Sequence, residues 1–333
     1  MNSLTHGTTV PTRSHQLAIG LISRLKPVLP ALLVGTTIGP AAAVTFTWDG
    51  KDRDDSNWVG APGALKNNWV SGHTPAANNT LVFAGMLRTI SNNNTAAATT
   101  YESLGFASDA VAFNLTGNSV TLTNGVTNSS LNAQTIAMPI ILNATHTFSG
   151  GPIAVNGAVT GTGRLNVMGK LGGVGSVGIQ TTIAGKYSPG VNNDPGLQRF
   201  SNKLAFSSGS IFEWDLDAPA TGGASVYDKI VATGIVSGSS TFNVVLGTNP
   251  SFENAFWNTP QSWPDIFSGS GTYLLSSLFP TFGGTGVSPT GLVAGQGVFS
   301  FKENTLNWTV VPEPSSVLFA GLLGMGLLRR QRC

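Results

Sequence analysis

The sequence predicts an all-β protein made of many short strands joined by glycine and asparagine corners. Three observations predict this fold class: only 10% of the 333 residues are charged, 42 are glycine, and apolar and polar residues alternate in many short runs. Glycine and β-branched residues disfavour helices, whereas they suit turns and strands. The alternating runs, in chain order, are 80–85, 110–117, 119–125, 152–157, 164–169, 203–206, 211–216, 229–234 and 241–247.

Most of these runs end at glycine or asparagine, the residues that accept positive φ at a corner. Such strands fit a parallel β-solenoid, in which each coil stacks on its neighbour, or alternatively a β-sandwich or jelly roll. The spacing between runs is irregular, so periodicity alone leaves both architectures open. The expected order of segments is a signal peptide (1–43), a solenoid-like body (44–250), an irregular loop or cap (251–298), a final strand (299–310) and a C-terminal signal (311–333).

The N-terminal segment has the three parts of a secretory signal peptide. Arg24 and Lys26 precede the apolar run 28–38, and a small-residue site follows. The run is interrupted by prolines and is too short to span a bilayer well. The alternative is a tail followed by a buried apolar segment. A signal peptide predicts export through the Sec translocon, with the cleavage site formed by Ala41 and Ala43.

The C-terminal segment combines a short motif, an apolar run and a basic cluster. As a helix, 315–328 would be about 21 Å long, which is shorter than the hydrocarbon core of a bilayer, although local thinning and snorkelling arginines compensate for part of the gap. The positive-inside rule keeps the arginines in the cytoplasm and the body outside. The motif is Pro312, Glu313 and Pro314; the expected membrane helix includes Val317, Leu318, Phe319, Leu322, Leu323, Leu327 and Leu328; the basic stop is Arg329, Arg330 and Arg332.

This order of motif, apolar helix and arginine cluster resembles the PEP-CTERM sorting signal of Gram-negative bacteria. The resemblance implies that a membrane-embedded exosortase recognises Pro312-Glu313-Pro314 and processes the tail. It also implies transit through the inner membrane, transient C-terminal anchoring, and then release or attachment at the cell surface. A plain tail anchor would give nearly the same topology without processing.

Two stretches of the body resemble autotransporter-related proteins. The opening, with Trp48-Asp-Gly50, Asn57-Trp58, Asn67-Asn-Trp69 and 79–85, is similar to proteins with autotransporter-associated β-strand repeats. A second stretch resembles the passenger repeats of autotransporters, in the segments 172–178, 183–185, 188–190, 204–206, 209–216 and 227–234. These resemblances imply a right-handed parallel β-helix and favour the solenoid over the sandwich.

Charge and cysteine content exclude several classes of function. Between residues 44 and 311, 14 Asp and Glu outnumber 11 Lys and Arg, so the body is mildly acidic and no nucleic-acid partner is expected. The only cysteine is Cys333, which excludes disulfides, cysteine-based zinc sites and a cysteine nucleophile from the body. No cofactor is expected.

The most catalytic-looking residues are Glu213, Asp215 and Asp217, which alternate along one run and would share one face of a strand. A hydrolytic pair needs two acids a few ångströms apart. We favour a solvated outer face, since charged residues on surface strands limit aggregation. The inward ladder would then be Phe212, Trp214 and Leu216.

Other candidate sites are weaker. The acidic cluster Asp49, Asp52, Asp54 and Asp55 offers hard oxygen ligands for calcium, but Lys51 and Arg53 lie inside it and a solvated loop is favoured. His73 and His146 are far apart in sequence and lack companion ligands. The glycines at 172–178 indicate corners between strands, because no helix follows them.

Aromatic residues of the opening allow two interpretations. Trp48, Trp58 and Trp69 are candidates for stacking on sugars, but an aromatic cap over the first coil is the favoured interpretation.

Three functions remain open. The leading one is a structural or adhesive surface or extracellular-matrix protein without catalytic activity, with exopolysaccharide as a partner. The second is a carbohydrate-binding module, which requires at least two exposed tryptophans on one surface among Trp48, Trp58, Trp69, Trp257 and Trp263. The third is a polysaccharide-active solenoid enzyme. It requires a groove in which Glu213, Asp215 or Asp217 meets another acid or a basic residue.

Overall fold

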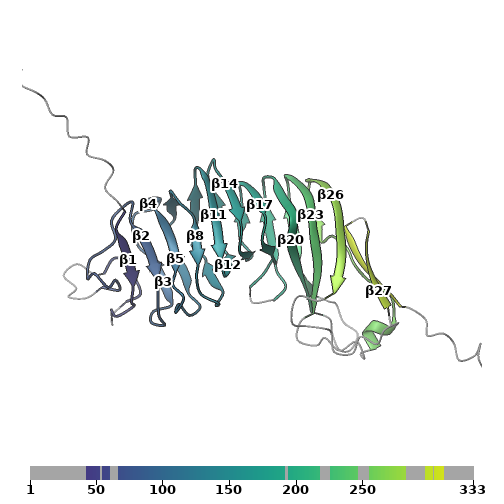
Figure 1. Cartoon of the computed structure of the whole chain (residues 1–333), viewed down its shortest axis with the longest axis horizontal. Helices are drawn as coiled ribbons and strands as arrows, with labels where there is room; N and C mark the ends of the chain where they lie inside the picture. Colours follow the sequence, from purple (N-terminus) through teal and green to yellow (C-terminus); the bar gives the residue numbers. More distant parts are fainter. Residues whose placement is uncertain are drawn as a thin grey trace, which may run out of the picture. The chain divides into compact units, whose positions relative to one another are not determined.

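The computed structural model describes residues 43–52, 55–60, 67–191, 194–217, 226–246, 255–282, 297–302 and 304–310. Within these ranges the regular structure is β-strand, apart from one 3-10 turn, η1(Ala255–Asn258). Strands of successive coils lie side by side in the order of the sequence (Figure 1). The expected all-β fold class is therefore confirmed.

Each complete coil contributes strand residues to three faces, which we call face 1, face 2 and face 3. Face 1 contains β1(Thr45–Trp48), β2(Thr80–Phe83), β5(Ser103–Phe106), β8(Val126–Asn128), β11(Thr145–Gly150), β14(Arg164–Val167) and β17(Gln180–Ile183). Face 2 contains β3(Ile90–Asn93), β6(Asn114–Gly117), β9(Gln134–Ile136), β12(Pro152–Val155), β15(Lys170–Gly172) and β18(Lys186–Tyr187). Face 3 contains β4(Thr99–Tyr101), β7(Val120–Leu122), β10(Ile140–Leu142), β13(Val159–Thr160), β16(Ser176–Val177), β19(Leu197–Phe200), β22(Lys229–Ala232) and β25(Phe267–Ser268).

Three long strands run continuously through face 1 and face 2: β20(Leu204–Asp217), β23(Ile235–Leu246) and β26(Thr272–Phe282). The pairing of β20 with β23 shifts register between Phe206 and Ser210, where the strands bend from one face to the next. Gly209 and Gly238 lie at this bend with φ of 88° and 106°, a conformation that glycine adopts without strain.

Parallel, in-register pairing decides between the two expected architectures. Leu81 pairs with Leu104, and Leu104 pairs with Val126 on the next coil. The same parallel relation continues along all three faces. A β-sandwich is built from antiparallel sheets, so the structure supports the parallel β-helix-like fold and excludes the sandwich.

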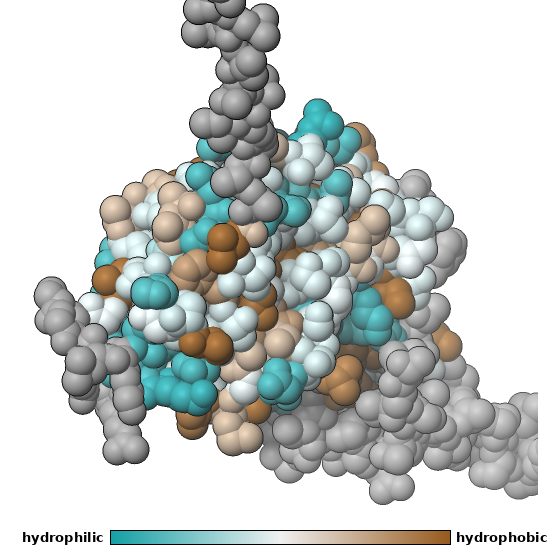
Figure 2. Space-filling model, turned by 60° about the vertical axis from the view of Figure 1, so that its left-hand side comes forward, coloured by the Kyte–Doolittle hydropathy of each residue, from teal (hydrophilic) through white to brown (hydrophobic). Residues whose placement is uncertain are grey.

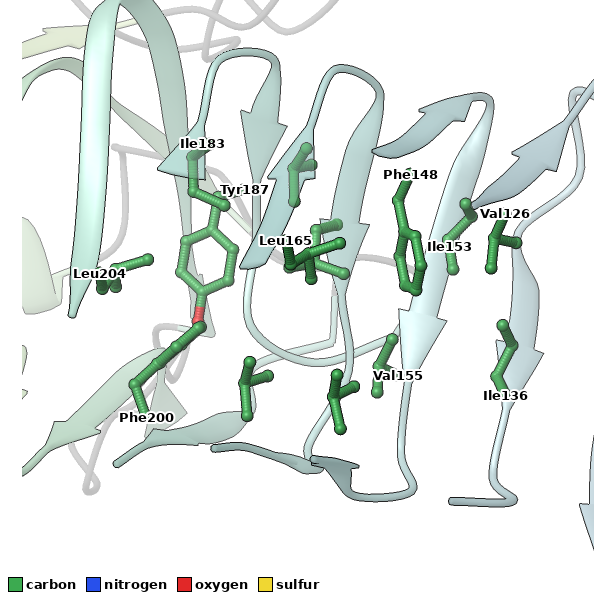
Figure 3. Close-up of a cluster of buried hydrophobic side chains, with 14 of the residues drawn as sticks. Val126, Ile136, Phe148, Ile153, Val155, Leu165, Ile183, Tyr187, Phe200 and Leu204 are labelled. Carbon is green, nitrogen blue, oxygen red and sulfur yellow. The ribbon is translucent and has the colours of Figure 1, made fainter. Parts of the chain in front are cut away.

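The core lies between the three faces and is filled by every second residue of the strands. Figure 3 shows Phe148, Leu165, Ile183 and Leu204 directed into this interior, each from a different coil of face 1. Burial of one such side chain contributes about 1.5–3 kcal/mol relative to exposure. The coils differ in length, since Leu81 pairs with Leu104 but Val167 pairs with Ile183. This variation explains the absence of a fixed period in the sequence.

An aromatic cluster caps the first coil. Trp48 and Trp69 meet edge-to-face with ring centroids 5.2 Å apart, and Trp58 lies 6.1 Å from Trp69. The indole N–H of Trp69 donates to the carbonyl of Trp58 at 2.8 Å. The backbone N–H of Val70 donates to the carbonyl of Thr47, so the backbone next to Trp69 covers the outer edge of β1. The favoured cap interpretation is confirmed, and this edge is protected from pairing with other chains.

The C-terminal part of the body differs from the expectation. We expected an irregular loop or cap at 251–298, but β25 pairs in parallel with β22 and β26 pairs in parallel with β23. The stack of coils therefore continues to Phe282, because Tyr273 and Leu275 alternate and pack against the core. The segments 247–254 and 283–296 lie outside the described residues.

A small antiparallel sheet follows the last coil. It contains β24(Gln261–Trp263), β27(Gly297–Lys302) and β28(Thr305–Val310). The single final strand expected at 299–310 is thus a hairpin, with Asn304 at a φ of 63° in its turn. The indole N–H of Trp308 donates to the carbonyl of Trp257 at 2.8 Å and ties this sheet to η1.

Candidate functional site

The terminal signals lie almost wholly outside the described residues. Of the residues expected there, only Ala43 belongs to the described part. Among the residues that the structure describes, no helix is long and apolar enough to cross a membrane. The predicted residues outside the described part are Ala41, the motif 312–314, the helix residues within 317–328 and the arginines 329, 330 and 332.

A cluster of charged side chains lies on the outer side of face 2. Lys170 of β15 pairs in register with Lys186 of β18, and β18 pairs with β20. This register brings both lysines to the carboxylate of Glu213: Lys170 Nζ is 2.8 Å from Oε2 and Lys186 Nζ is 2.9 Å from Oε1. The three side chains come from positions far apart in the sequence, and only the stacking of coils unites them.

Glu213 is held in its ionised form by this pair of lysines. Burial raises the pKa of the carboxyl, but hydrogen bonds and charge from Lys170 and Lys186 outweigh that effect and lower the pKa below its ordinary value. The residue is 8% exposed. The carboxylate is therefore shielded from salt more than that of a surface pair, although the side chain of Lys186 is 42% exposed.

Asp215 occupies the next outward position of β20 and is 1% exposed. Its Oδ2 accepts a hydrogen bond from Ser188 Oγ at 2.9 Å, and its Oδ1 has no hydrogen-bond partner among the described residues. Burial raises the pKa of Asp215 to about 6, against the Ser188 bond and the charge of Lys170, which lower it. The charges of Glu213 and Asp194 add to the rise.

Asp228 is hydrogen-bonded to the backbone of Asp215. Its carboxylate accepts the backbone N–H of Gly196 at 2.7 Å and that of Asp215 at 3.0 Å. Its own backbone carbonyl accepts the indole N–H of Trp214 at 2.9 Å. Burial, and then the charge of Asp215, raise the pKa of Asp228 well above its ordinary value. Sequence reasoning did not single out Asp228, although Tyr227-Asp228 precedes an alternating run, where an acidic side chain can satisfy backbone donors of a turn.

The expected solvated face of β20 is wrong for two of its three acids. Asp217 is exposed, but Glu213 and Asp215 are buried. The reason is the long connection between β18 and β19, whose residues Ser188 and Gly196 bond to Asp215 and Asp228. The inward ladder is confirmed, since Phe212, Trp214 and Leu216 are buried.

A cavity of about 360 Å³ adjoins this cluster on face 2. Its lining includes Lys170, Gly172 and Ser188, together with Ala154 of the preceding coil and Leu131. The cluster and the cavity thus share Lys170 and Ser188. No sequence pattern pointed to the cavity, because its residues come from separate coils.

The sugar-stacking assignment of Trp48, Trp58 and Trp69 is wrong. All seven tryptophans of the chain are buried in the core or its caps, including Trp257 and Trp263. Their rings fill the interior, where aromatic surface contributes most to packing. On the face shown in Figure 2, the exposed apolar side chains are scattered among polar ones. A carbohydrate module based on exposed tryptophans therefore has no support from these residues.

The remaining candidates are not brought together. Asp49 pairs with Lys51 at 3.1 Å, Asp55 accepts the backbone N–H of Asn57, and Asp54 lies outside the described residues. Among the residues described, no group of three or more His, Cys, Asp or Glu is placed to hold a metal ion.

The other candidates, His73, His146 and the glycine run 172–178, lie in different parts of the fold. His73 is exposed in a loop, whereas His146 is buried in β11, and burial lowers its pKa. The glycine run forms the corner after β15, where Gly173 has a φ of 108°.

Comparison of the sequence with protein-family models and with curated proteins found no match.

Proposed function

We propose that this chain is an exported structural or adhesive protein of the surface or extracellular matrix of a Gram-negative bacterium. The observation that carries the proposal is that the two termini specify the same topology. The basic and apolar N-terminal segment directs the chain outward, and the arginines at 329, 330 and 332 retain the C-terminal end on the cytoplasmic side.

The body suits a structural role. Parallel coils bury one continuous hydrophobic core without a cysteine, so stability does not depend on the redox state of the compartment. The aromatic cap over β1 limits edge-to-edge association. In this proposal the segment Pro312-Glu313-Pro314 is a PEP-CTERM motif, and an exosortase-type enzyme processes the tail after export through the Sec translocon.

Fractionation and intact mass of the product test this function. The full-length chain is expressed in a Gram-negative host with an exosortase and in an otherwise identical host without it. We expect a surface or medium product that lacks Cys333 only when the exosortase is present. Glu313→Ala should abolish the mass change, whereas the control Glu303→Ala, ten residues upstream, should not. An intact chain with Cys333 in the cytosol of both hosts would overturn the proposal.

Polysaccharide cleavage is a second candidate, favoured by one observation. Glu213 and Asp215 lie two residues apart with pKa values displaced in opposite directions, which is the pattern of an acid and base pair. We place it second because Asp215 and Asp228 are 1% and 0% exposed, and a catalytic acid must contact its substrate. Release of reducing ends by the wild type and not by Asp215→Asn would support cleavage. Equal values for both proteins at background would exclude it.

A further inference from the structure

The cavity on face 2 is a recess whose floor is made of small side chains. Ala154 pairs in register with Thr135 on one side and with Gly172 on the other. A Cβ added to Gly172 would lie 2.8 Å from the carbonyl oxygen of Ser188 and 2.9 Å from that of Gly190. Glycine thus lets the chain after β18 pass close over β15. The floor is therefore formed by β12 and β15, and Ser188, Gly190 and Val191 of the chain after β18 also line the recess.

Polar and apolar groups meet at the border of this recess. Lys170 lines it, and the ammonium groups of Lys170 and Lys186 converge on the carboxylate of Glu213. Ammonium donors and a carboxylate acceptor are therefore adjacent: Lys170 lines the recess itself, and Glu213 and Lys186 adjoin it through their ion pairs. Leu131, which is 97% exposed, and Pro152 also line the recess. An exposed leucine at the rim of a recess offers apolar surface to a ligand rather than to the core.

This combination matches the chemistry of a sugar. A hydroxyl both donates and accepts hydrogen bonds, so it can pair with the ammonium groups and with the carboxylate at once. The C–H faces of a pyranose ring complement the apolar rim. The cavity volume of about 360 Å³ is in the range of small-molecule sites.

Two other ligand classes fit less well. A polyanion is disfavoured, because the ionised Glu213 and the partly ionised Asp215 offset the two ammonium groups. An extended peptide usually binds by adding a strand to an open sheet edge. Here β12, β15 and β18 each pair with a strand on both sides, so the floor offers no such edge.

We infer that the recess binds a segment of an uncharged polysaccharide. Lys170, Lys186 and Glu213 hydrogen-bond its hydroxyl groups, and Leu131 and Ala154 contact the ring faces. Access to such a polymer in the cell rests on the proposed surface location, but the binding itself does not. Failure of export and failure of binding are therefore separate results.

Isothermal titration of the full-length chain in mild detergent tests this site. The probes are hexasaccharides of glucose, xylose, mannose and galactose, with hexagalacturonate and a hexaglutamate peptide as the acidic saccharide and peptide arms. We expect at least one neutral hexasaccharide to bind. Ala154→Phe fills the floor and should weaken that binding at least tenfold. The matched control Thr160→Phe, at an exposed position of β13 on face 3, should leave it within twofold.

Further variants test the site in case Ala154→Phe misfolds. Leu131→Ala changes an exposed side chain, so it should leave the melting temperature unchanged and weaken binding several-fold. Lys186→Gln should also weaken binding, whereas Lys203→Gln, at a corner away from face 2, should not. The inference is overturned if no neutral hexasaccharide binds, if only hexagalacturonate or the peptide binds, or if Leu131→Ala and Lys186→Gln bind like the wild type.

Discussion

Asp228 and Asp215 are joined by reciprocal hydrogen bonds. The backbone N–H of Asp215 donates to Asp228 Oδ2 at 3.0 Å, and the backbone N–H of Asp228 donates to the carbonyl of Asp215 at 3.0 Å. Since Gly196 donates to the other oxygen of the same carboxylate, one side chain fastens the connection before β19 to the long strand β20. This attachment fixes the chain between β18 and β19, which passes close over Gly172 of β15.

Removal of the Asp228 carboxylate should destabilise the fold strongly. Asp228→Ala leaves the N–H groups of Gly196 and Asp215 without their acceptor, and each buried unpaired donor costs about 1–3 kcal/mol. We expect a loss of about 2–5 kcal/mol in the free energy of unfolding, measured by urea titration. Asp217→Ala, at an exposed position of the same strand, is the control and should change it by no more than about 0.5 kcal/mol. Equal effects of the two variants would contradict the role of Asp228.

The pKa of Asp215 predicts that stability falls as pH rises. The folded protein holds this proton up to about pH 6, whereas the ordinary value is 3.8, so the folded state binds more protons between those values. The stabilising contribution is complete below 3.8 and is lost on the way to about 6. A difference of this size corresponds to about 3 kcal/mol.

Asp215→Asn isolates this effect, because the amide oxygen can still accept the Ser188 hydroxyl. The variant minus wild-type difference in unfolding free energy should increase from pH 4 to pH 7. The charged groups that face this carboxyl, Glu213, Asp194, Lys170 and Asp228, are retained in both proteins. A difference that is constant with pH would show that Asp215 has an ordinary pKa.

Loss of the aromatic cap should unfold the first coils before the others. Trp69 is buried against Trp48, Trp58 and Phe83. Trp69→Ala should cost about 3–5 kcal/mol. Because each coil contacts mainly its neighbours, hydrogen exchange should accelerate in β1 and β2 and remain slow in β14. The neighbouring exposed Val70→Ala should leave the exchange pattern unchanged; uniform acceleration along the chain in Trp69→Ala would argue against local capping.

Two glycines at the bend between face 1 and face 2 are required for different physical reasons. Both Gly209 and Gly238 have positive φ, but a Cβ on Gly209 would meet no atom within 4 Å, whereas on Gly238 it would lie 1.9 Å from the carbonyl oxygen of Phe206. Gly209→Ala should therefore cost only the backbone strain of about 1–2 kcal/mol. Gly238→Ala should cost clearly more in thermal unfolding. Equal losses would mean that close approach is not what requires glycine there.

Alternation predicted the coils well where strands are short and end at glycine. The runs 80–85 and 164–169 contain β2 and β14, because their inward side chains, Leu81 and Phe83 in β2 and Leu165 and Val167 in β14, fill the core. The last coil was missed since Pro280 interrupts its run and the neighbouring aromatic residues dominate the pattern. A proline in a strand ordinarily argues against that assignment.

The candidate site was predicted only in part. Glu213 and Asp215 were recognised by their spacing, but their burial depends on the connection after β18, which no local pattern places over face 2. Lys170 and Lys186 were not recognised at all. Their meeting with Glu213 follows from the register of β15, β18 and β20, which is a long-range property of the stack.

The described strands that flank the connections from β18 to β19, from β20 to β22 and from β23 to β25 place all three at the same corner, between face 2 and face 3. Residues inserted there would lengthen a connection without changing the strand pairing of either face. The β18–β19 connection supplies Ser188, Gly190 and Val191 to the recess, so natural variation there can reshape the recess while the scaffold stays constant. Under the proposed binding role, changes in ligand preference should map to this connection before they map to the strands.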